Sequence, residues 1–226
     1  MTIDFNSEAS LGCLSVSGED AANFLKGQMT CDVSELEEDN GTCGAFCNAK
    51  GRVISTFYLI KTQSEFLCIL PNCLLSVIQE RLKRYKLRAK VEISENNFDI
   101  NTFNLPNNLP WLTHETSEEF IPQWLNLDKL GGISFTKGCY TGQEIVARTH
   151  YLGEVKRRLF MATYDINTGV INGNSPIIDE IETTVGHVLN AHDGVMQCVL
   201  NVGVRIKTLR LANTLQEIVV IKELYE

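Results

Sequence analysis

KGCYTGQE, at residues 137–144, places a single thiol, Cys139, between two glycines and two residues after Lys137. In this octet, Thr141 is followed three residues later by Glu144, a spacing that lets each side chain satisfy an amide of a first helical turn. The spacing predicts a capping box and a helix that begins directly after the threonine. Cys139 would then lie just outside the positive end of the helix dipole, near Lys137, and both effects favour the thiolate. The octet therefore predicts a reactive cysteine.

Other uses of this thiol have to be considered. Cys139 could be a small buried residue beside glycines that only shape a turn, because free cysteine is among the most buried residue types. A catalytic couple with His150 fails on geometry, since a helix over residues 142–150 would separate the two by about 15 Å. Cys43 and Cys47 have no second pair of ligands near a histidine, so we predict no metal site.

Composition restricts the class of protein. The chain has 226 residues, of which 44% are hydrophobic, and a formal net charge of −8. These values are typical of a water-soluble globular protein, and the negative charge argues against direct binding of nucleic acid. No apolar run reaches the roughly 18 residues of a membrane span, and the first ten residues carry no Lys or Arg. With eight cysteines scattered through apolar segments, we expect a cytoplasmic protein without a membrane partner.

One basic run departs from the acidic average. Lysines and arginines occupy positions 81, 83, 84, 86, 88 and 90 with no acid among them. The run could be an anion site for phosphates or a polyglutamate tail, or simply a solvated face. Apolar residues recur at helical spacing from 74 to 85 and alternate from 87 to 93 as in a half-buried strand. Periodicity favours the solvated face, with Arg81, Lys83 and Arg84 pointing outward, and leaves a secondary anion-binding role open.

The distribution of patterns along the chain predicts an α+β fold with mainly antiparallel sheets, packed helices and a small C-terminal all-β barrel. A helix capped by Ser17 is expected through about Gln28, another from about Asn72, and a short one near Ser117 that contains Phe120 and Trp124. Beyond Gly153 the composition changes to short β-rich runs separated by turn signals. The predicted domains are residues 1–152 and 153–226. The predicted strands are 11–16, 42–47, 52–60, 66–70, 88–93, 155–163, 183–190, 195–202 and 217–222, with a further candidate near 97–103.

The octet resembles the signature of the YgfZ family of folate-binding proteins, which are relatives of the glycine-cleavage T-protein. Residues 24–33, FLKGQMTCDV, resemble the N-terminal helix and following loop of that family. Residues 48–53, NAKGRV, resemble its Pro-Lys-Gly-Arg hairpin, with Ala49 in place of the proline. Residues 127–158 follow the family almost continuously, so the resemblance extends well beyond one motif.

The resemblance implies a folate-binding core formed by residues 1–152, with tetrahydrofolate or a related folate in a central cavity, beside a C-terminal β-barrel. It implies a role in the assembly or repair of iron-sulfur enzymes, including tRNA-thiolating enzymes. The implied partners are folate and iron-sulfur client enzymes or assembly proteins. It also implies that the thiol of the octet, here Cys139, is required.

A folate has a flat aromatic head and an anionic tail, so its site needs apolar walls, a few polar anchors and a cation. For each candidate the alternative is an ordinary core aromatic or a solvated polar residue. The candidate cofactor-binding residues are Phe24, Trp124 and Tyr140 as walls, Lys137 and Arg148 for the tail, and Gln143 and Glu144 for the pterin.

The alternative function is a tetrahydrofolate-dependent aminomethyl or methyl transferase. For such an enzyme the resemblance implies an aspartate after the strand that precedes the second helix. The corresponding residues 68–79 contain no Asp or Glu, so the acid-base group of a transferase is missing. A tRNA-binding module is opposed by the net charge, and a folate-independent thiol enzyme lacks an identifiable base. We therefore expect a non-catalytic or weakly catalytic accessory protein; if it is an enzyme, it is a tetrahydrofolate-dependent one-carbon transferase.

Overall fold

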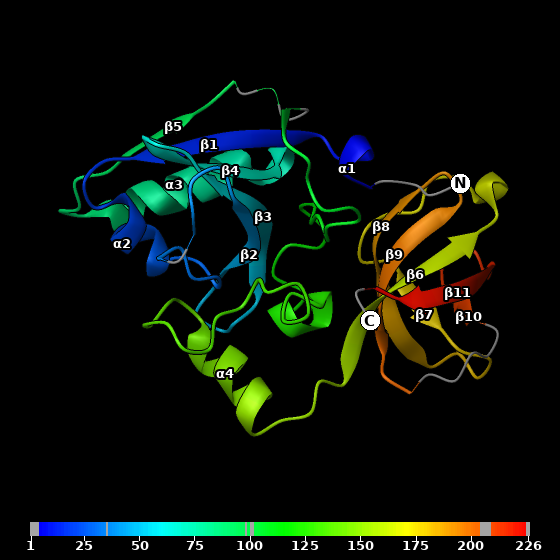
Figure 1. The fold of residues 1–226 in the computed structure, drawn as a ribbon. Helices are drawn as coiled ribbons and strands as arrows, with labels where there is room; N and C mark the ends of the chain where they lie inside the picture. The colour runs from blue at the N-terminus through cyan, green and yellow to red at the C-terminus, as the bar shows by residue number, and fades with distance from the viewer. Residues whose placement is uncertain (1–4, 35, 98, 100–101, 204–208, 225–226) are drawn as a thin grey trace.

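The computed structural model describes residues 5–34, 36–97, 99, 102–203 and 209–224. An antiparallel sheet and a closed β-barrel lie side by side, and helix α4 (Gln143–Tyr151) projects below the sheet in Figure 1. The predicted α+β class with antiparallel sheets and a C-terminal barrel is confirmed. The five-stranded sheet has the order β2-β3-β4-β1-β5. Its strands are β1 (Leu11–Ser17), β2 (Gly41–Cys47), β3 (Val53–Lys61), β4 (Glu65–Pro71) and β5 (Glu92–Glu95).

Two helices, α2 (Ala21–Lys26) and α3 (Leu75–Lys86), cover one face of the sheet because each carries an apolar stripe. Phe24 of α2 and Ile78 of α3 belong to one buried cluster with Leu14 of β1. A short 3-10 turn, η1 (Asn72–Leu74), leads into α3. The candidate wall Phe24 is thus 9% exposed and packs within the protein core.

Three local predictions are wrong at their boundaries. Ser17 does not cap the helix that follows it: α2 begins at Ala21 after Asp20, because Ser17 still pairs with Glu65 and Glu92 in the sheet. The strand expected over residues 88–93 starts only at Glu92, as β5, since Leu87 adopts a positive φ of 45° at the end of α3. The candidate strand near 97–103 includes positions outside the described residues. The other face of the sheet carries turns near Ser117 and then a 3-10 helix, η3 (Pro122–Leu125), in place of the predicted helix.

The turns found in place of the predicted helix form backbone hydrogen bonds with the start of β3. The amide of Glu118 donates to Val53 O at 2.7 Å, and the amide of Val53 donates to Phe120 O at 2.8 Å. Glu118 has a φ of 65°, a conformation that a helix cannot contain. Proline is well placed at the first position of a helical turn, so Pro122 opens η3.

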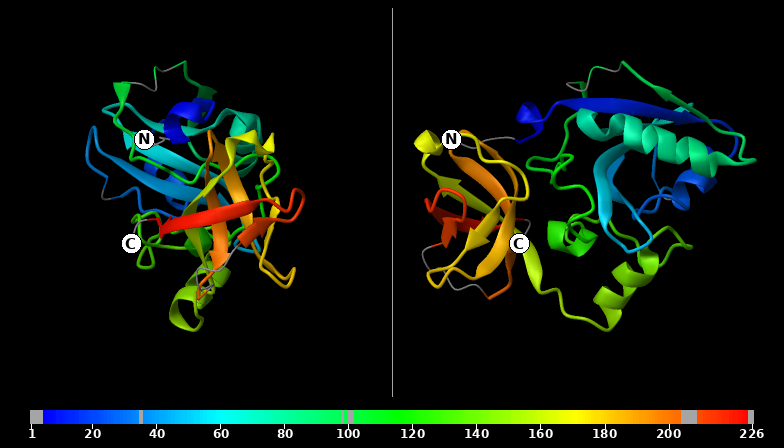
Figure 2. Two further views of the ribbon diagram at one scale, coloured as in Figure 1. Left: turned by 90° about the vertical axis from the view of Figure 1, so that its right-hand side faces the viewer. Right: turned by 180° about the vertical axis from the view of Figure 1, so that it is seen from behind.

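The barrel closes in the order β10-β11-β6-β9-β8-β7, and Figure 2 shows it from two further sides. Two of its strands are only three residues long, which is why periodicity did not reveal them. The division into domains at residue 153 falls between α4 and β6 and stays a proposal. The strands are β6 (Arg157–Tyr164), β7 (Pro176–Ile178), β8 (Thr184–His192), β9 (Val195–Asn201), β10 (Leu209–Leu211) and β11 (Glu217–Glu223); the remaining short helices are α1 (Phe5–Glu8) and η4 (Ile166–Thr168).

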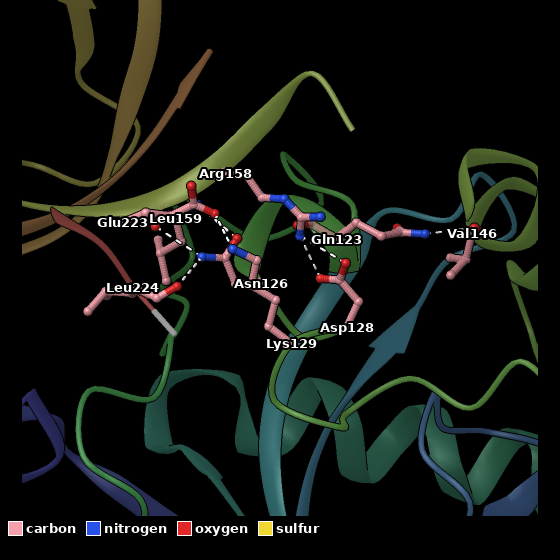
Figure 3. Close-up of polar contacts among 9 residues, drawn as sticks. All are labelled: Gln123, Asn126, Asp128, Lys129, Val146, Arg158, Leu159, Glu223 and Leu224. Atoms are coloured by element: carbon pink, nitrogen blue, oxygen red, sulfur yellow. Dashed lines mark hydrogen bonds and ion pairs between the residues drawn. The ribbon is translucent and has the colours of Figure 1, made fainter. Parts of the chain in front are cut away.

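Asn126 forms the junction between sheet and barrel (Figure 3). Its side chain is fully buried, and its Nδ2 donates to Leu159 O at 3.0 Å and to Leu224 O at 2.6 Å. Its Oδ1 accepts from the amide of Leu159 at 3.2 Å. Beside it, Arg158 donates to both carboxylate oxygens of Asp128, at 2.7 and 2.9 Å. One amide therefore holds the ends of β6 and β11 to the segment that follows η3.

Among the described residues, no helix is long and apolar enough to cross a membrane.

Candidate functional site

Lys137 attaches the octet to the loop that follows α2. Its side chain is buried, with 7% exposed, and its Nζ donates to the carbonyl oxygens of Lys26 at 2.8 Å and Cys31 at 2.7 Å. A third hydrogen bond goes to Met29 O. An ammonium has three donors, so all of them are used. The octet and residues 24–33, far apart in the chain, are thereby held in contact.

Two glycines let the octet contact the hairpin at residues 48–51. Gly142 has a φ of +84°, and a Cβ placed on it would clash with Asn48 O and lie 2.9 Å from the Cα of Gly51. Gly51 has a φ of +69°, and its Cβ would lie 2.8 Å from that of Ile145. No other residue fits these conformations at such a distance. The segments that resemble one family in the sequence therefore meet at one place.

Cys139 is exposed, so the alternative of a buried structural cysteine is wrong. It is preceded by the exposed Gly138, where an added Cβ would meet nothing within 4 Å, and the two lie between the buried Lys137 and Tyr140. Helix α4 follows at Gln143, so the thiol lies just ahead of the helix, as predicted. The buried neighbours on either side anchor a short open segment that presents the thiol to solvent.

The capping box predicted for the octet is wrong. The residue that caps α4 is Gly142, and no side chain donates or accepts a capping hydrogen bond there. The left-handed backbone of Gly142, imposed by its contact with the hairpin, displaces the cap by one residue from Thr141. Glu144 instead pairs with Arg148 at 2.7 Å, and both side chains are largely exposed. Gln143 reaches back, and its Oε1 accepts from the amide of Tyr140 at 3.3 Å.

Tyr140, the fourth residue of the octet, is buried, with 7% of its surface exposed. The Lys137 ammonium lies 4.7 Å from its ring centroid, and burial, the largest cause, raises the pKa of its hydroxyl. Within the described part of the chain that hydroxyl has no hydrogen-bond partner. Cys47 lies beside it, and its backbone carbonyl accepts a hydrogen bond from Arg81 Nη2 at 2.8 Å. The buried Nε of Arg81 and the Oε1 of Gln28 also lack a partner among these residues.

Sequence reasoning missed Arg81 and Gln28. The prediction that Arg81 faces solvent is wrong, because its guanidinium packs over the Tyr85 ring at 4.9 Å and reaches β2. The signal was its spacing: Arg81 lies three residues after Ile78 and next to Leu82, at the edge of the apolar stripe of α3. Gln28 lies in the segment at residues 24–33 that carries the family resemblance.

Trp124, the remaining candidate wall, lies between the sheet and the barrel. Its ring is 5.1 Å from the Cζ of Arg52 and 4.8 Å from the Cζ of Arg157. Neither arginine was predicted as a site residue, although Arg52 follows the hairpin glycine directly. Trp124 therefore belongs to a second group, which we call the arginine–tryptophan stack and define as Arg52, Trp124 and Arg157.

The predicted site residues thus do not form one cluster. Cys139, Lys137, Tyr140 and Gln143 share a single turn of chain, whereas Phe24 packs in the core and Trp124 joins the stack. Glu144 and Arg148 lie on the exposed face of α4. In the described residues, no group of three or more His, Cys, Asp or Glu side chains is arranged to hold a metal ion.

The fold has a counterpart among solved structures. Aminomethyltransferase T of the glycine cleavage system from Bartonella henselae superimposes with a TM-score of 0.67, covering 96% of this chain and 84% of that protein, at 10% identity. At this identity the likeness concerns the fold alone. The chain therefore has the fold of the glycine-cleavage T-proteins.

Sequence comparison then gives the family. No family model matches the chain. The tRNA-modifying protein YgfZ of Colwellia psychrerythraea is 31% identical over 220 residues, a match that covers 66% of this chain and 68% of that protein. The tRNA-modifying protein YgfZ of Vibrio atlanticus is 28% identical over 236 residues, covering 76% and 70%. The chain belongs to the YgfZ family, and the resemblance seen in its sequence is confirmed.

Proposed function

We propose that this chain is a folate-binding accessory protein that supports the assembly or repair of iron-sulfur enzymes, including enzymes that thiolate tRNA. The observation that carries the proposal is the exposed thiol of Cys139, held between two buried anchors where the octet, residues 24–33 and the hairpin meet. The names of the relatives, tRNA-modifying proteins, support the link to tRNA modification.

Unpaired polar atoms support a folate as the ligand. Tyr140 Oη, Arg81 Nε and Gln28 Oε1 are buried without a partner in the described part of the chain, although such burial costs about 1–3 kcal/mol for each group. Together they offer two donors and two acceptors, which suits the edge of a pterin ring. We propose that these residues, with Gln143, hold the pterin. A reduced folate would supply a one-carbon carrier there.

Cys139 is the proposed reactive centre. It is exposed and lies at a turn of chain that Lys137 and Tyr140 hold in place, so a client protein can reach its sulfur without unfolding the site. We propose that it exchanges with a cluster or a sulfur species rather than acting in hydrolysis, for which a positioned base would be needed. The partners would be iron-sulfur client enzymes or assembly proteins.

A cytoplasmic location is part of the proposal. All eight cysteines are free thiols, six of them buried, which fits a reducing compartment. The transferase alternative predicts folate-dependent turnover, and the absence of an acid in residues 68–79 argues against it.

The test combines calorimetric titration of tetrahydrofolate with rescue of a bacterial strain that lacks its own YgfZ. We expect the wild type to bind tetrahydrofolate and to rescue. Cys139→Ala should bind but not rescue, and Cys73→Ala, which removes the other exposed thiol, should do both. Full rescue by Cys139→Ala contradicts the role of the thiol, and a wild type that binds no folate contradicts the cofactor assignment.

A further inference from the structure

The arginine–tryptophan stack brings two cations to one indole ring. The Cζ atoms of Arg52 and Arg157 lie 5.1 and 4.8 Å from the ring centroid of Trp124, so they are no further apart than the sum of these distances. All three side chains are half-buried. Two like charges at this separation repel each other, and partial removal from water strengthens that repulsion.

Neither guanidinium directly contacts a carboxylate of the described residues, although the Glu119 carboxylate is near enough to act on His187 beside Arg157. Arg52 Nη1 donates to Glu119 O at 2.5 Å, and Arg157 Nε donates to Asn201 Oδ1 at 3.1 Å, but both acceptors are uncharged. Within the described chain neither arginine forms an ion pair. Since a guanidinium has five N–H donors, most of those on each group are available to an anion.

Neighbouring cations at the same junction do have acidic partners within the chain. Nη1 of Arg158, the next residue after Arg157, donates to both carboxylate oxygens of Asp128, and Lys129 lies 2.6 Å from a carboxylate oxygen of Glu223 (Figure 3). A half-buried charge without a partner is unfavourable, so these pairs are what the junction needs for its own stability. The missing counter-charge at the stack therefore indicates an anion that comes from outside the chain.

The cations first predicted for a folate tail are already engaged. Lys137 uses its three donors on backbone carbonyls, and Arg148 is paired with Glu144 on the surface of α4. Along the sequence, the stack lies close to the proposed pterin site. Arg52 directly follows Gly51, and Gly51 contacts the octet at Gly142. The stack therefore offers cationic donors to a ligand tail that leaves that site.

We propose that Arg52 and Arg157, which both pack against Trp124, bind the carboxylates of the folate's glutamate tail. The proposal rests on the proposed function, since it assumes that a folate is the ligand. Two guanidinium forks match carboxylates in bidentate geometry, and each added glutamate contributes one more carboxylate. The net charge of −8 favours this compact anion over an extended nucleic acid.

Calorimetry with tetrahydrofolate carrying one or three glutamates tests the assignment. The wild type should bind the triglutamate about tenfold more tightly than the monoglutamate, because charge-assisted hydrogen bonds are added. Arg52→Gln and Arg157→Gln should each lose most of this preference, whereas Arg84→Gln, which removes an exposed charge from α3, should keep it. Equal binding of both ligands by the wild type, or equal loss in all three variants, overturns the tail site. A wild type that binds neither ligand overturns the proposed function instead.

His187 provides a second readout that needs no variant. Burial and then the charge of Arg157 lower the pKa of its imidazole, and Glu119 acts in the opposite direction. A carboxylate bound at Arg157 would offset the positive charge and raise this pKa. NMR titration of the His187 imidazole should show the rise with the triglutamate bound, and an unchanged titration with the ligand bound contradicts the proposal.

Discussion

The ammonium of Lys137 lies 2.7 Å from the backbone carbonyl oxygen of Cys31, a residue 106 positions earlier in the chain. With two further carbonyls, of Lys26 and Met29, it has as many acceptors as it has donors. A lysine that could have been reserved for a ligand thus maintains the contact between two segments of the site. Its removal should change the fold of the site before it changes any ligand contact.

Lys137 should make the stability of the protein depend on pH. Burial lowers the pKa of its ammonium from 10.5 to about 8, although Cys31 and Asp32 oppose the shift. Between these two values the unfolded chain binds more protons than the folded one, so the free energy of unfolding rises with pH. This contribution is fully present above pH 10.5 and is lost as the pH falls through 8.

The measurement is urea unfolding of the wild type and Lys137→Met between pH 7 and 10. The wild type should gain about 1–2 kcal/mol relative to the variant above pH 8, less than the full shift implies because carbonyl acceptors favour the ammonium. Taking the difference between the two proteins removes the titration of groups that they share. A difference that stays constant with pH would show that Lys137 keeps its ordinary pKa.

Gly142→Ala should destabilise the protein by about 2–4 kcal/mol, because the new Cβ meets Asn48 O and the left-handed backbone is strained. Thermal and urea unfolding measure the loss. Gly138→Ala is the matched control within the octet, since its Cβ would have nothing within 4 Å. Equal effects of the two substitutions would mean that the contact with the hairpin contributes nothing to stability.

The periodicity of the sequence was sufficient to predict the long elements of the fold. Strands β1 to β4 and helix α3 agree with prediction to within a few residues, because each has a continuous apolar pattern. The boundaries of elements were predicted wrongly where a tertiary contact overrides local preference. Ser17 stays in the sheet, and Leu87 adopts a positive φ that no sequence pattern indicates. The three-residue strands β7 and β10 are too short to show alternation.

The site was predictable where function depends on one local segment. The octet predicted a thiol just ahead of a helix, and the structure places the exposed Cys139 there; its reactivity stays a prediction. The partners of its other residues were not predictable, since Lys137 bonds to carbonyls, which every residue carries and no side-chain pattern marks. Likewise, Trp124 meets Arg52 and Arg157 only because sheet and barrel come together, a relationship between distant positions that a single sequence does not contain.

Asn126→Ala should weaken the junction between sheet and barrel by about 3 kcal/mol. The substitution leaves the buried carbonyl of Leu224 without its Asn126 donor and the amide of Leu159 without its Asn126 acceptor, while the carbonyl of Leu159 keeps the amide of Leu224 as a donor at 3.0 Å. Urea unfolding followed by tryptophan fluorescence measures the loss. Asn213→Ala, in an exposed turn of the barrel, should change the free energy of unfolding by no more than about 0.5 kcal/mol. An Asn126→Ala variant as stable as this control would contradict the assigned role.

Alkylation of the native protein by iodoacetamide should modify Cys139 and Cys73 and spare the six buried cysteines. Cys73 should react slowly for an exposed thiol, because desolvation raises its pKa and makes its thiolate scarce. Cys31 is the most informative of the buried group, since burial raises its pKa to about 12 and its carbonyl holds Lys137. Peptide mapping by mass spectrometry gives the rate at each position, and the same reaction in urea should modify all eight.

If Cys31 reacts in the native protein as fast as Cys139, the octet does not hold the loop after α2 closed. If Cys31 stays protected in wild type but reacts in Lys137→Met, the ammonium itself keeps that loop in place.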